Sequence, residues 1–300
     1  MRAIVVDRWM EPSELAVREA PEPRLRPGGL LVDVRAAGCN FFDILMARGQ
    51  YQVRPPFPFI PGAEVAGVVR EVAAGVRDFA PGDYVLSAPG IGAFAERAVV
   101  AADATWKMPP DMSFDEAAAL PIVYPTSYAG LVYRAALRPG EQLLVHAAAG
   151  GVGIAAVQIG KALGARVLAT AGGPEKLEIA RQAGADVIYD SVGGDTTDLS
   201  LKCIAWNGRL LVIGIASGKI PEVELNRVLL KNIAVTGLHW GAHAVHEPAR
   251  VGETFRALFD LYAAGKIRPV IFGRHPLAEV PAALDVLGSR KSYGKIIVTP

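Results

Sequence analysis

The sequence has few cysteines, almost no net charge and no long hydrophobic run, and each of these absences excludes a class of protein. The two cysteines, Cys39 and Cys203, are too few for a disulfide framework or a structural zinc site. A net charge of +1 gives no electrostatic footprint for nucleic acid or an anionic membrane surface. No apolar run approaches the roughly 18 residues that a membrane span needs. Because Met1–Val6 has strand character rather than that of a secretory signal, we expect a cytoplasmic protein without nucleic-acid or membrane partners.

The sequence does contain enough apolar material for two hydrophobic cores. Hydrophobic residues make up 51% of the 300, and this length exceeds the usual size of a single domain. Short β patterns such as Leu30–Val34 and Val65–Val72 fill the first part of the chain, separated by Pro and Gly. From about Asp115, helix and strand patterns alternate, which is typical of a parallel sheet with helices on both faces.

We therefore expect an α/β protein with two domains, one of them discontinuous in sequence. Residues 1–118 are expected to form a small, mostly antiparallel β domain, and residues 119–252 a doubly wound parallel sheet. After a helix at 251–264 the β patterns return and end in Lys295–Thr299. Residues 253–300 are accordingly expected to rejoin the first domain.

The most informative segment is a glycine-rich turn between a predicted strand at 142–147 and a predicted helix at 151–163. A strand, a glycine turn and a helix in this order present backbone N–H groups to a pyrophosphate. Gly150 and Gly153 let the backbone approach the phosphates and the helix pack closely, although Ala148 replaces the first glycine of the usual fingerprint. The alternative is an ordinary strand-to-helix turn; the flanking strand and helix favour a dinucleotide site.

The β/α alternation has one irregularity. A predicted strand at 166–171 leads through a helix at 174–183 directly into a strand at 187–190. If this last strand lies beside the first one, the helix would close a left-handed crossover, whereas about 98% of such crossovers are right-handed. We therefore expect that a strand and a helix are missing near residues 185–189.

Several segments in order resemble the medium-chain dehydrogenase/reductase superfamily, and within it the zinc-free quinone oxidoreductases related to ζ-crystallin. These segments are Gly38–Asp43, Pro61–Gly67, Ala148–Gly153, Tyr189–Gly194 and Ser292–Lys295. The similarity covers essentially the whole chain apart from the apparent gap. It implies a Rossmann-type dinucleotide-binding domain and a GroES-like β domain that carries the substrate site.

The resemblance also indicates what is missing from the chain, namely a metal site. Zinc-dependent members carry a cysteine ligand where this chain has Asn40, a histidine where it has Ala63, and a four-cysteine structural lobe. Without these ligands no catalytic zinc is expected. His239, His243 and His246 have partly suitable spacing, but the pair Trp240-Gly241 interrupts any helix between them and no acidic partner sits at the right offset. We expect no metal.

The second predicted strand ends without the carboxylate that NAD-binding proteins use to hold the ribose 2′-hydroxyl. Residues 169–176 read Ala-Thr-Ala-Gly-Gly-Pro-Glu-Lys, which leaves room for the 2′-phosphate of NADPH. Lys176, near the start of the following helix, would supply positive charge, and the helix end adds its dipole. The alternative is a solvated helix lysine. The sequence therefore predicts NADPH as cofactor.

The resemblance implies further cofactor contacts around the nicotinamide. Thr126 is similar to a threonine near the nicotinamide ribose, and residues 214–218 to a loop under the nicotinamide. Lys295 resembles a C-terminal lysine near the cofactor, although a surface lysine is the simpler alternative. The full predicted cofactor set is Thr126, Ala149, Gly150, Gly151, Val152, Gly172, Lys176, Val192, Gly193, Gly214, Ile215, Ser217 and Lys295.

The resemblance places Asn40, Asp43 and Tyr51 around the substrate, and these are the predicted catalytic residues. Asn40 is a suitable neutral donor to a quinone or enone oxygen, but capping the helix that begins at Phe41 is nearly as good an explanation. Tyr51 can donate to the same oxygen or simply pack in a loop. Asp43 is equally well explained as a structural helix residue.

These observations predict an NADPH-dependent, zinc-free reductase that transfers a hydride to a quinone. One alternative is a reductase of activated C=C bonds in an enone or enoyl thioester. A second is a non-catalytic, nucleotide-binding structural protein. The apolar run within 232–238 would leave an exposed edge strand, so we also expect a homodimer that pairs through this strand.

Overall fold

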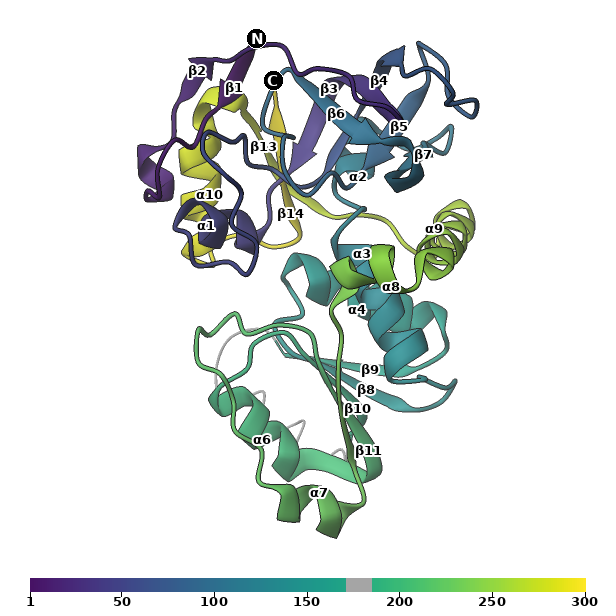
Figure 1. Cartoon of the computed structure of the whole chain (residues 1–300). Coiled ribbons are helices and arrows are strands. Elements are labelled where there is room, and N and C mark those ends of the chain that lie inside the picture. The colour runs from purple at the N-terminus through teal and green to yellow at the C-terminus, as the bar shows by residue number, and fades with distance from the viewer. Residues whose placement is uncertain (171–184) are drawn as a thin grey trace. The chain divides into compact units, whose positions relative to one another are not determined.

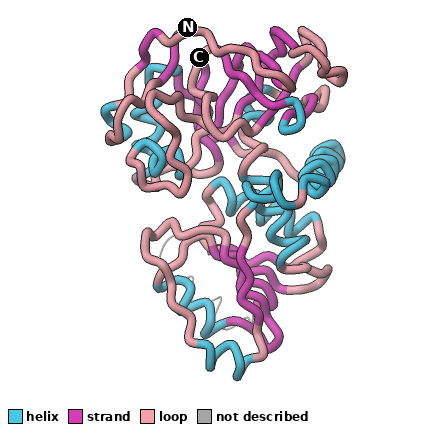
Figure 2. The backbone as a smooth tube through the Cα atoms, viewed as in Figure 1, coloured by secondary structure: helices cyan, strands magenta, loops and turns pink. Residues whose placement is uncertain are grey.

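The computed structural model describes residues 1–170 and 185–300, which fall into two compact units. Unit 1 comprises Met1–Ile122 and Pro269–Pro300, and unit 2 comprises Val123–Arg268. Figure 1 shows the elements of each unit, and Figure 2 shows that strands dominate the first and helices flank a compact sheet in the second. The architecture is the expected α/β combination of a mostly antiparallel sheet and a parallel one.

The second boundary between the units lies at Arg268, sixteen residues beyond the expected one at 252. Helix α9 (Pro248–Ala263) accounts for the difference, because it contacts α3 (Val123–Ala129) within unit 2. Its buried side chains include Phe255 and Leu258. An amphipathic pattern predicts such a helix but not the partner on which it packs.

Unit 1 is built on a sheet with the strand order β13-β14-β3-β4-β5-β7, to which β6 adds by pairing with β3. Neighbouring strands are antiparallel except β13 and β14. Helices α1 and α10 contact each other beside this sheet (Figure 1). The strands are β3 (Gly29–Gly38), β4 (Val65–Val72), β5 (Tyr84–Ser87), β6 (Arg97–Ala101), β7 (Thr105–Lys107), β13 (Ile271–Pro276) and β14 (Lys295–Thr299), and the helices are α1 (Phe41–Ala47), α2 (Phe114–Ala118) and α10 (Val280–Gly288). A separate pair is formed by β1 (Arg2–Ile4) and β2 (Val17–Glu19).

Unit 2 contains a five-stranded parallel sheet with the order β12-β11-β10-β8-β9. Helix α4 covers one face, and α6 and α7 lie over the other (Figure 1). The strands are β8 (Gln142–Val145), β9 (Arg166–Ala169), β10 (Ala185–Asp190), β11 (Ile204–Val212) and β12 (Ala234–Gly237), and the further helices are α4 (Gly151–Ala162), α6 (Asp195–Cys203), α7 (Leu225–Lys231) and α8 (His243–His246). Leu143, Leu144 and Ile188 are fully buried in these strands, as a sheet covered on both faces requires.

The strand order places β10 directly beside β8, which was the premise of the expected gap. Within the described ranges, β9 forms the outer edge of the sheet and no strand pairs with it on the far side. The connection from β9 to β10 runs through 171–184, so the predicted helix at 174–183 and the handedness of the crossover lie outside the described residues. The missing strand and helix stay a prediction.

Candidate functional site

The glycine-rich turn joins the carboxyl end of β8 to the start of α4, where the sequence placed it. Gly150 is the N-cap of α4, and its carbonyl oxygen accepts a hydrogen bond from Ile154 N–H at 2.8 Å. A Cβ atom on Gly153 would lie 2.3 Å from the carbonyl oxygen of Ala147, so only glycine fits where the helix meets the turn. The first N–H groups of a helix have no intrahelical partners and carry the positive end of its dipole. The turn and Ala149–Val152 therefore provide a cradle suited to a phosphate group.

Two further loops follow β10 and β11 at the same edge of the parallel sheet. Asp190, the last residue of β10, accepts hydrogen bonds from the N–H groups of Val192 at 2.8 Å and Gly193 at 3.0 Å. Ser217 N–H donates to the carbonyl oxygen of Val192 at 2.9 Å. A Cβ on Gly193 would lie 3.1 Å from Ile215 Cγ2. The structure therefore brings both loops, with the intervening Gly214, to the edge where doubly wound folds bind nucleotides.

Helix α3 carries the predicted Thr126 and is tied to this edge by Ser127, a residue that sequence reasoning missed. The Ser127 hydroxyl oxygen lies 2.9 Å from the carbonyl oxygens of Val123 and Val152 and 2.9 Å from the hydroxyl of Tyr189. These contacts join α3 to the first turn of α4 and to β10. A serine inside a helix has no local pattern that marks such a role.

Buried His146 is a second residue that sequence reasoning missed. Its Nδ1 lies 3.0 Å from Thr170 Oγ1 and its Nε2 lies 2.8 Å from Ser200 Oγ. Burial lowers the pKa of the imidazole, and the charge of Asp190 opposes this shift. The neutral ring thus links the end of β9 to α6. The predicted Gly172 and Lys176 lie just beyond Thr170, outside the described residues.

A buried polar cluster in unit 1 contains three predicted residues, Asn40, Asp43 and Lys295, together with Glu64, which sequence reasoning did not select. Each of the four is at most 6% exposed. The Lys295 ammonium group donates to the carbonyl oxygen of Cys39 at 2.6 Å, to Asn40 Oδ1 at 2.8 Å and to the Glu64 carboxylate. An ammonium group has three donors, so this geometry leaves Lys295 none for a cofactor.

Asn40 is also occupied by the cluster. Its Nδ2 donates to Glu64 Oε1 at 2.9 Å and approaches the carbonyl oxygen of Gly38 at 3.4 Å. Its backbone N–H donates to Asp43 Oδ2 at 2.7 Å, which fixes the start of α1. The amide that we expected to donate to a substrate oxygen is therefore bound internally, and its observed role is to join β3, α1 and Glu64.

The remaining two predicted catalytic residues, Asp43 and Tyr51, also lie in unit 1. Asp43 is 1% exposed, and its Oδ1 is buried without a hydrogen-bond partner among the residues that the structure describes. Burial raises the pKa of Asp43 to about 7, against the opposing effects of the Asn40 and Gly62 N–H groups and the Lys295 charge. Tyr51 is half-buried and stacks on Phe42 with ring centroids 5.2 Å apart.

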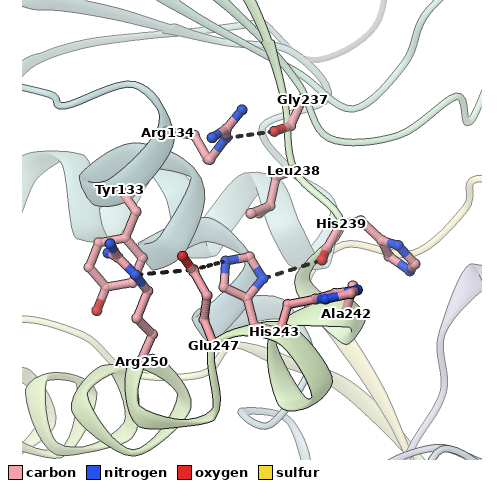
Figure 3. A pocket seen from close by; sticks show the side chains of 10 residues that line it. Tyr133, Arg134, Gly237, Leu238, His239, Ala242, His243, Glu247 and Arg250 are labelled. Atoms are coloured by element: carbon pink, nitrogen blue, oxygen red, sulfur yellow. Dashed lines mark hydrogen bonds and ion pairs between the residues drawn. The ribbon is translucent and has the colours of Figure 1, made fainter.

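A shallow pocket of about 300 Å³ lies beside the end of β12 in unit 2 (Figure 3). The Arg250 guanidinium lies 4.6 Å from the ring centroid of Tyr133, and Arg250 Nε lies 3.1 Å from the Glu247 carboxylate. His243 Nε2 is 3.5 Å from the same carboxylate. In 1–170 and 185–300, no three His, Cys, Asp or Glu side chains form a group that could hold a metal ion. The charged groups of this pocket mainly pair with one another.

None of the helices in the described ranges combines the length and the apolar character that crossing a bilayer requires.

Two family models match the chain. The alcohol dehydrogenase GroES-like domain matches residues 26–110, and a zinc-binding dehydrogenase model matches residues 163–298. The chain is 39% identical over 294 residues to quinone oxidoreductase-like protein 2 homolog of Nematostella vectensis, covering 89% of this chain and 80% of the relative. It is 35% identical over 324 aligned positions to quinone oxidoreductase-like protein 2 of Rattus norvegicus, covering 99% and 92%. Since 324 exceeds the 300 residues of this chain, that relative carries segments that have no counterpart here.

Solved structures with the same fold agree with these sequence comparisons. A mycobacterial structure in complex with NADPH superposes with a TM-score of 0.91 at 31% identity, covering 100% of both chains. Escherichia coli quinone oxidoreductase in complex with NADPH gives a TM-score of 0.89 at 29% identity, again covering 100% of both. The chain also resembles 13% of the much longer NorB protein of a polyketide synthase system in Streptomyces orinoci, at 36% identity over 94% of this chain.

Proposed function

The chain belongs to the medium-chain dehydrogenase/reductase superfamily as a zinc-free, quinone oxidoreductase-like member, and we propose that it reduces quinones with NADPH. It is an oxidoreductase whose cofactor is NADPH, in keeping with the two NADPH complexes that share its fold. When bound, NADPH supplies the hydride. Asn40 and Ala63 stand where zinc-dependent relatives carry ligands, so polarisation of the acceptor falls to side chains rather than to a metal.

The observation that carries this proposal is the edge of the parallel sheet in unit 2. No described side chain caps the N-terminus of α4, whose first N–H groups are suited to the pyrophosphate, and Gly153 allows the helix to start against the turn. The loops at Val192–Gly193 and Gly214–Ser217 are held together by backbone hydrogen bonds and form the neighbouring wall. These residues hold and orient the cofactor, and such positioning is the main contribution of the protein to hydride transfer.

The proposal is tested by following NADPH consumption with a soluble 1,4-quinone, with NADH in parallel. We expect rapid turnover with NADPH and little with NADH. Lys176→Ala is expected to raise the KM for NADPH about tenfold and to leave the KM for NADH unchanged. The reason is that only NADPH has the 2′-phosphate, and the loss of a contact worth about 1.4 kcal/mol weakens binding tenfold. Equal use of both cofactors, or an unchanged KM in the variant, would contradict the proposed role of Lys176.

A second candidate function is reduction of an activated C=C bond in an enone or enoyl thioester. It is favoured by the similarity to a segment of a polyketide synthase system. Both reactions deliver a hydride to a conjugated acceptor, so the same cofactor site serves either. Measuring kcat/KM for a panel of quinones and enones under identical conditions shows which of the two reactions the protein catalyses more efficiently. No turnover with any acceptor would favour the non-catalytic alternative.

We further propose that the protein forms a homodimer through the edge strand within 232–238. Strand β12 lies at the edge of the sheet, and Ala234, Val235 and Gly237 are exposed. Helix α7, which leads into β12, exposes Leu225 and Leu229 by 78% each. An open edge beside apolar side chains favours pairing with a second copy. Sedimentation is expected to give twice the mass of 31.7 kDa, and a monomer at working concentration would count against the proposal.

A further inference from the structure

A chain of hydrogen-bonded polar groups crosses the carboxyl ends of β9 and β8 and ends in α6. Its members are Thr170, His146, Ser200 and the carbonyl oxygen of Thr196. We propose that His146 takes up a proton when the 2′-phosphate of NADPH binds, and that this proton converts the Thr170 hydroxyl into a hydrogen-bond donor to the phosphate. The inference rests on the proposed function, because it concerns recognition of the same cofactor.

The direction of each hydrogen bond in this chain follows from its inner end. The carbonyl oxygen of Thr196 can only accept, so the single hydroxyl proton of Ser200 points to it over 2.7 Å. Ser200 Oγ is then left as an acceptor, and His146 Nε2, at 2.8 Å, must carry a proton. In a neutral imidazole the other ring nitrogen has no proton. Nδ1 therefore accepts from the Thr170 hydroxyl at 3.0 Å.

Thr170 stands where doubly wound folds recognise the adenosine ribose. It follows Gly150 by 20 positions, and about 20 is the spacing at which NAD-binding proteins place the acidic residue that holds the ribose 2′-hydroxyl. Its carbonyl oxygen accepts from Ala148 N–H at 2.9 Å, which attaches it to the glycine-rich turn. Thr170 is partly exposed, whereas His146 is 1% exposed. A ligand can therefore reach the hydroxyl but not the imidazole.

With a neutral imidazole, the Thr170 hydroxyl is the wrong partner for a phosphate. Its proton is used by Nδ1, so the oxygen offers a ligand only lone pairs, and phosphate oxygens are acceptors as well. Protonation of Nδ1 reverses this one hydrogen bond, because the imidazolium donates to Thr170 Oγ1 and the hydroxyl proton can turn to the phosphate. The bond to Ser200 is unchanged, since Nε2 carries a proton in both forms. The proton comes from solvent, and no other covalent bond forms or breaks.

The charges around His146 suit a proton that arrives together with the phosphate. Burial lowers the pKa of the imidazole, so the ring is neutral before the cofactor binds and has a nitrogen free to take the proton. In 1–170 and 185–300, Asp190 of β10 is the titratable group that acts on the ring, and the Asp190 charge favours the imidazolium. The partners from β9 and α6, Thr170 and Ser200, are neutral. The 2′-phosphate brings about two negative charges near pH 7, which favour the imidazolium further.

Calorimetric titration with NADPH in buffers of different ionisation enthalpy measures the proton directly. At about pH 7 a phosphate monoester, with a pKa of about 6, has already lost most of its second proton, so we expect net proton uptake from His146. NADH, which lacks the 2′-phosphate, should exchange no proton. His146→Gln keeps an N–H donor for Ser200 but cannot be protonated, and the uptake should disappear. His275→Gln is the matched control, because His275 pairs with Glu279 in unit 1 and should leave the uptake unchanged.

Two further measurements follow the two residues separately. Nitrogen chemical shifts of the His146 ring, assigned by their absence from His146→Gln, should show one protonated nitrogen in the free protein and two in the NADPH complex. Thr170→Val removes the hydroxyl from a side chain of similar shape. It is expected to weaken NADPH binding about tenfold and NADH binding much less, because a hydrogen bond to a charged group is lost only with NADPH.

These results separate the inference from the proposed function. Binding of NADPH without proton uptake, or an uptake that persists in His146→Gln, would overturn the role of His146. Equal weakening of NADPH and NADH binding by Thr170→Val would overturn the role of the Thr170 hydroxyl. Failure of NADPH to bind at all, or absence of turnover with every acceptor, would overturn the proposed function instead.

Discussion

Replacement of Lys295 by methionine is expected to lower the free energy of unfolding by about 3–5 kcal/mol, because removal of one partner from a buried ion pair leaves the other charge uncompensated. Lys295 and Glu64 are 4% and 0% exposed, and the ammonium group also binds Asn40 Oδ1 and a backbone carbonyl. Methionine has similar length and fills the same space, so the loss reports the charge rather than a cavity. Urea-induced unfolding measures the effect.

Two further variants make this result specific. Lys291→Met removes an exposed lysine of the same segment and is expected to stay within about 0.5 kcal/mol of the native protein. Adding Glu64→Gln to Lys295→Met is expected to recover part of the lost stability, because it removes the uncompensated charge. If Lys295 instead contacts the cofactor, Lys295→Met would leave stability unchanged and raise the KM for NADPH. This last pattern would contradict the buried arrangement described above.

The second large effect is expected from Gly153→Ala. The new Cβ would lie 2.3 Å from Ala147 O and 2.7 Å from Ala148 Cα, and both are backbone atoms that cannot rotate away. The start of α4 must therefore move, and its N–H groups with it. We expect NADPH to bind at least about tenfold more weakly, a loss of about 1.4 kcal/mol, together with a measurable loss of stability. Fluorescence titration gives the affinity.

Gly150→Ala is the control for this steric argument, and its effect is measured as a change in the free energy of unfolding. A Cβ at this position would meet its nearest neighbour, Ala147 O, at 3.4 Å, and the backbone has an ordinary φ of −74°. Its free energy of unfolding should therefore change by less than about 1 kcal/mol. If Gly153→Ala binds NADPH with native affinity, the close packing of α4 on the turn is not what holds the cofactor site together.

Local patterns predicted the elements of this fold that depend on local interactions. The turn between β8 and α4 follows from an apolar run, three glycines and a helical period, all within residues 142–163. The parallel sheet follows from repeated alternation of such units. The packing partner of α9 did not follow, because an apolar helix face does not reveal which surface covers it.

The buried cluster could not be predicted because its members are joined only in space. Lys295 and Glu64 are 231 positions apart, and neither has an ionic partner nearby in sequence. The available sign was that both are charged residues directly beside apolar strands, Val65–Val72 and Ile296–Thr299. For the same reason Asn40 was expected to face a substrate, whereas the structure shows its amide bound on both sides.

The position of β14 between β13 and β3 has a consequence for the order in which the protein is made. Residues 123–268 leave the ribosome as an uninterrupted unit and have all their own contacts available. The sheet of the other unit, although begun first, cannot close until Lys295–Thr299 has emerged, and until then Glu64 lacks its positive partner. The later part of the chain is thus ready to fold before the earlier part can finish.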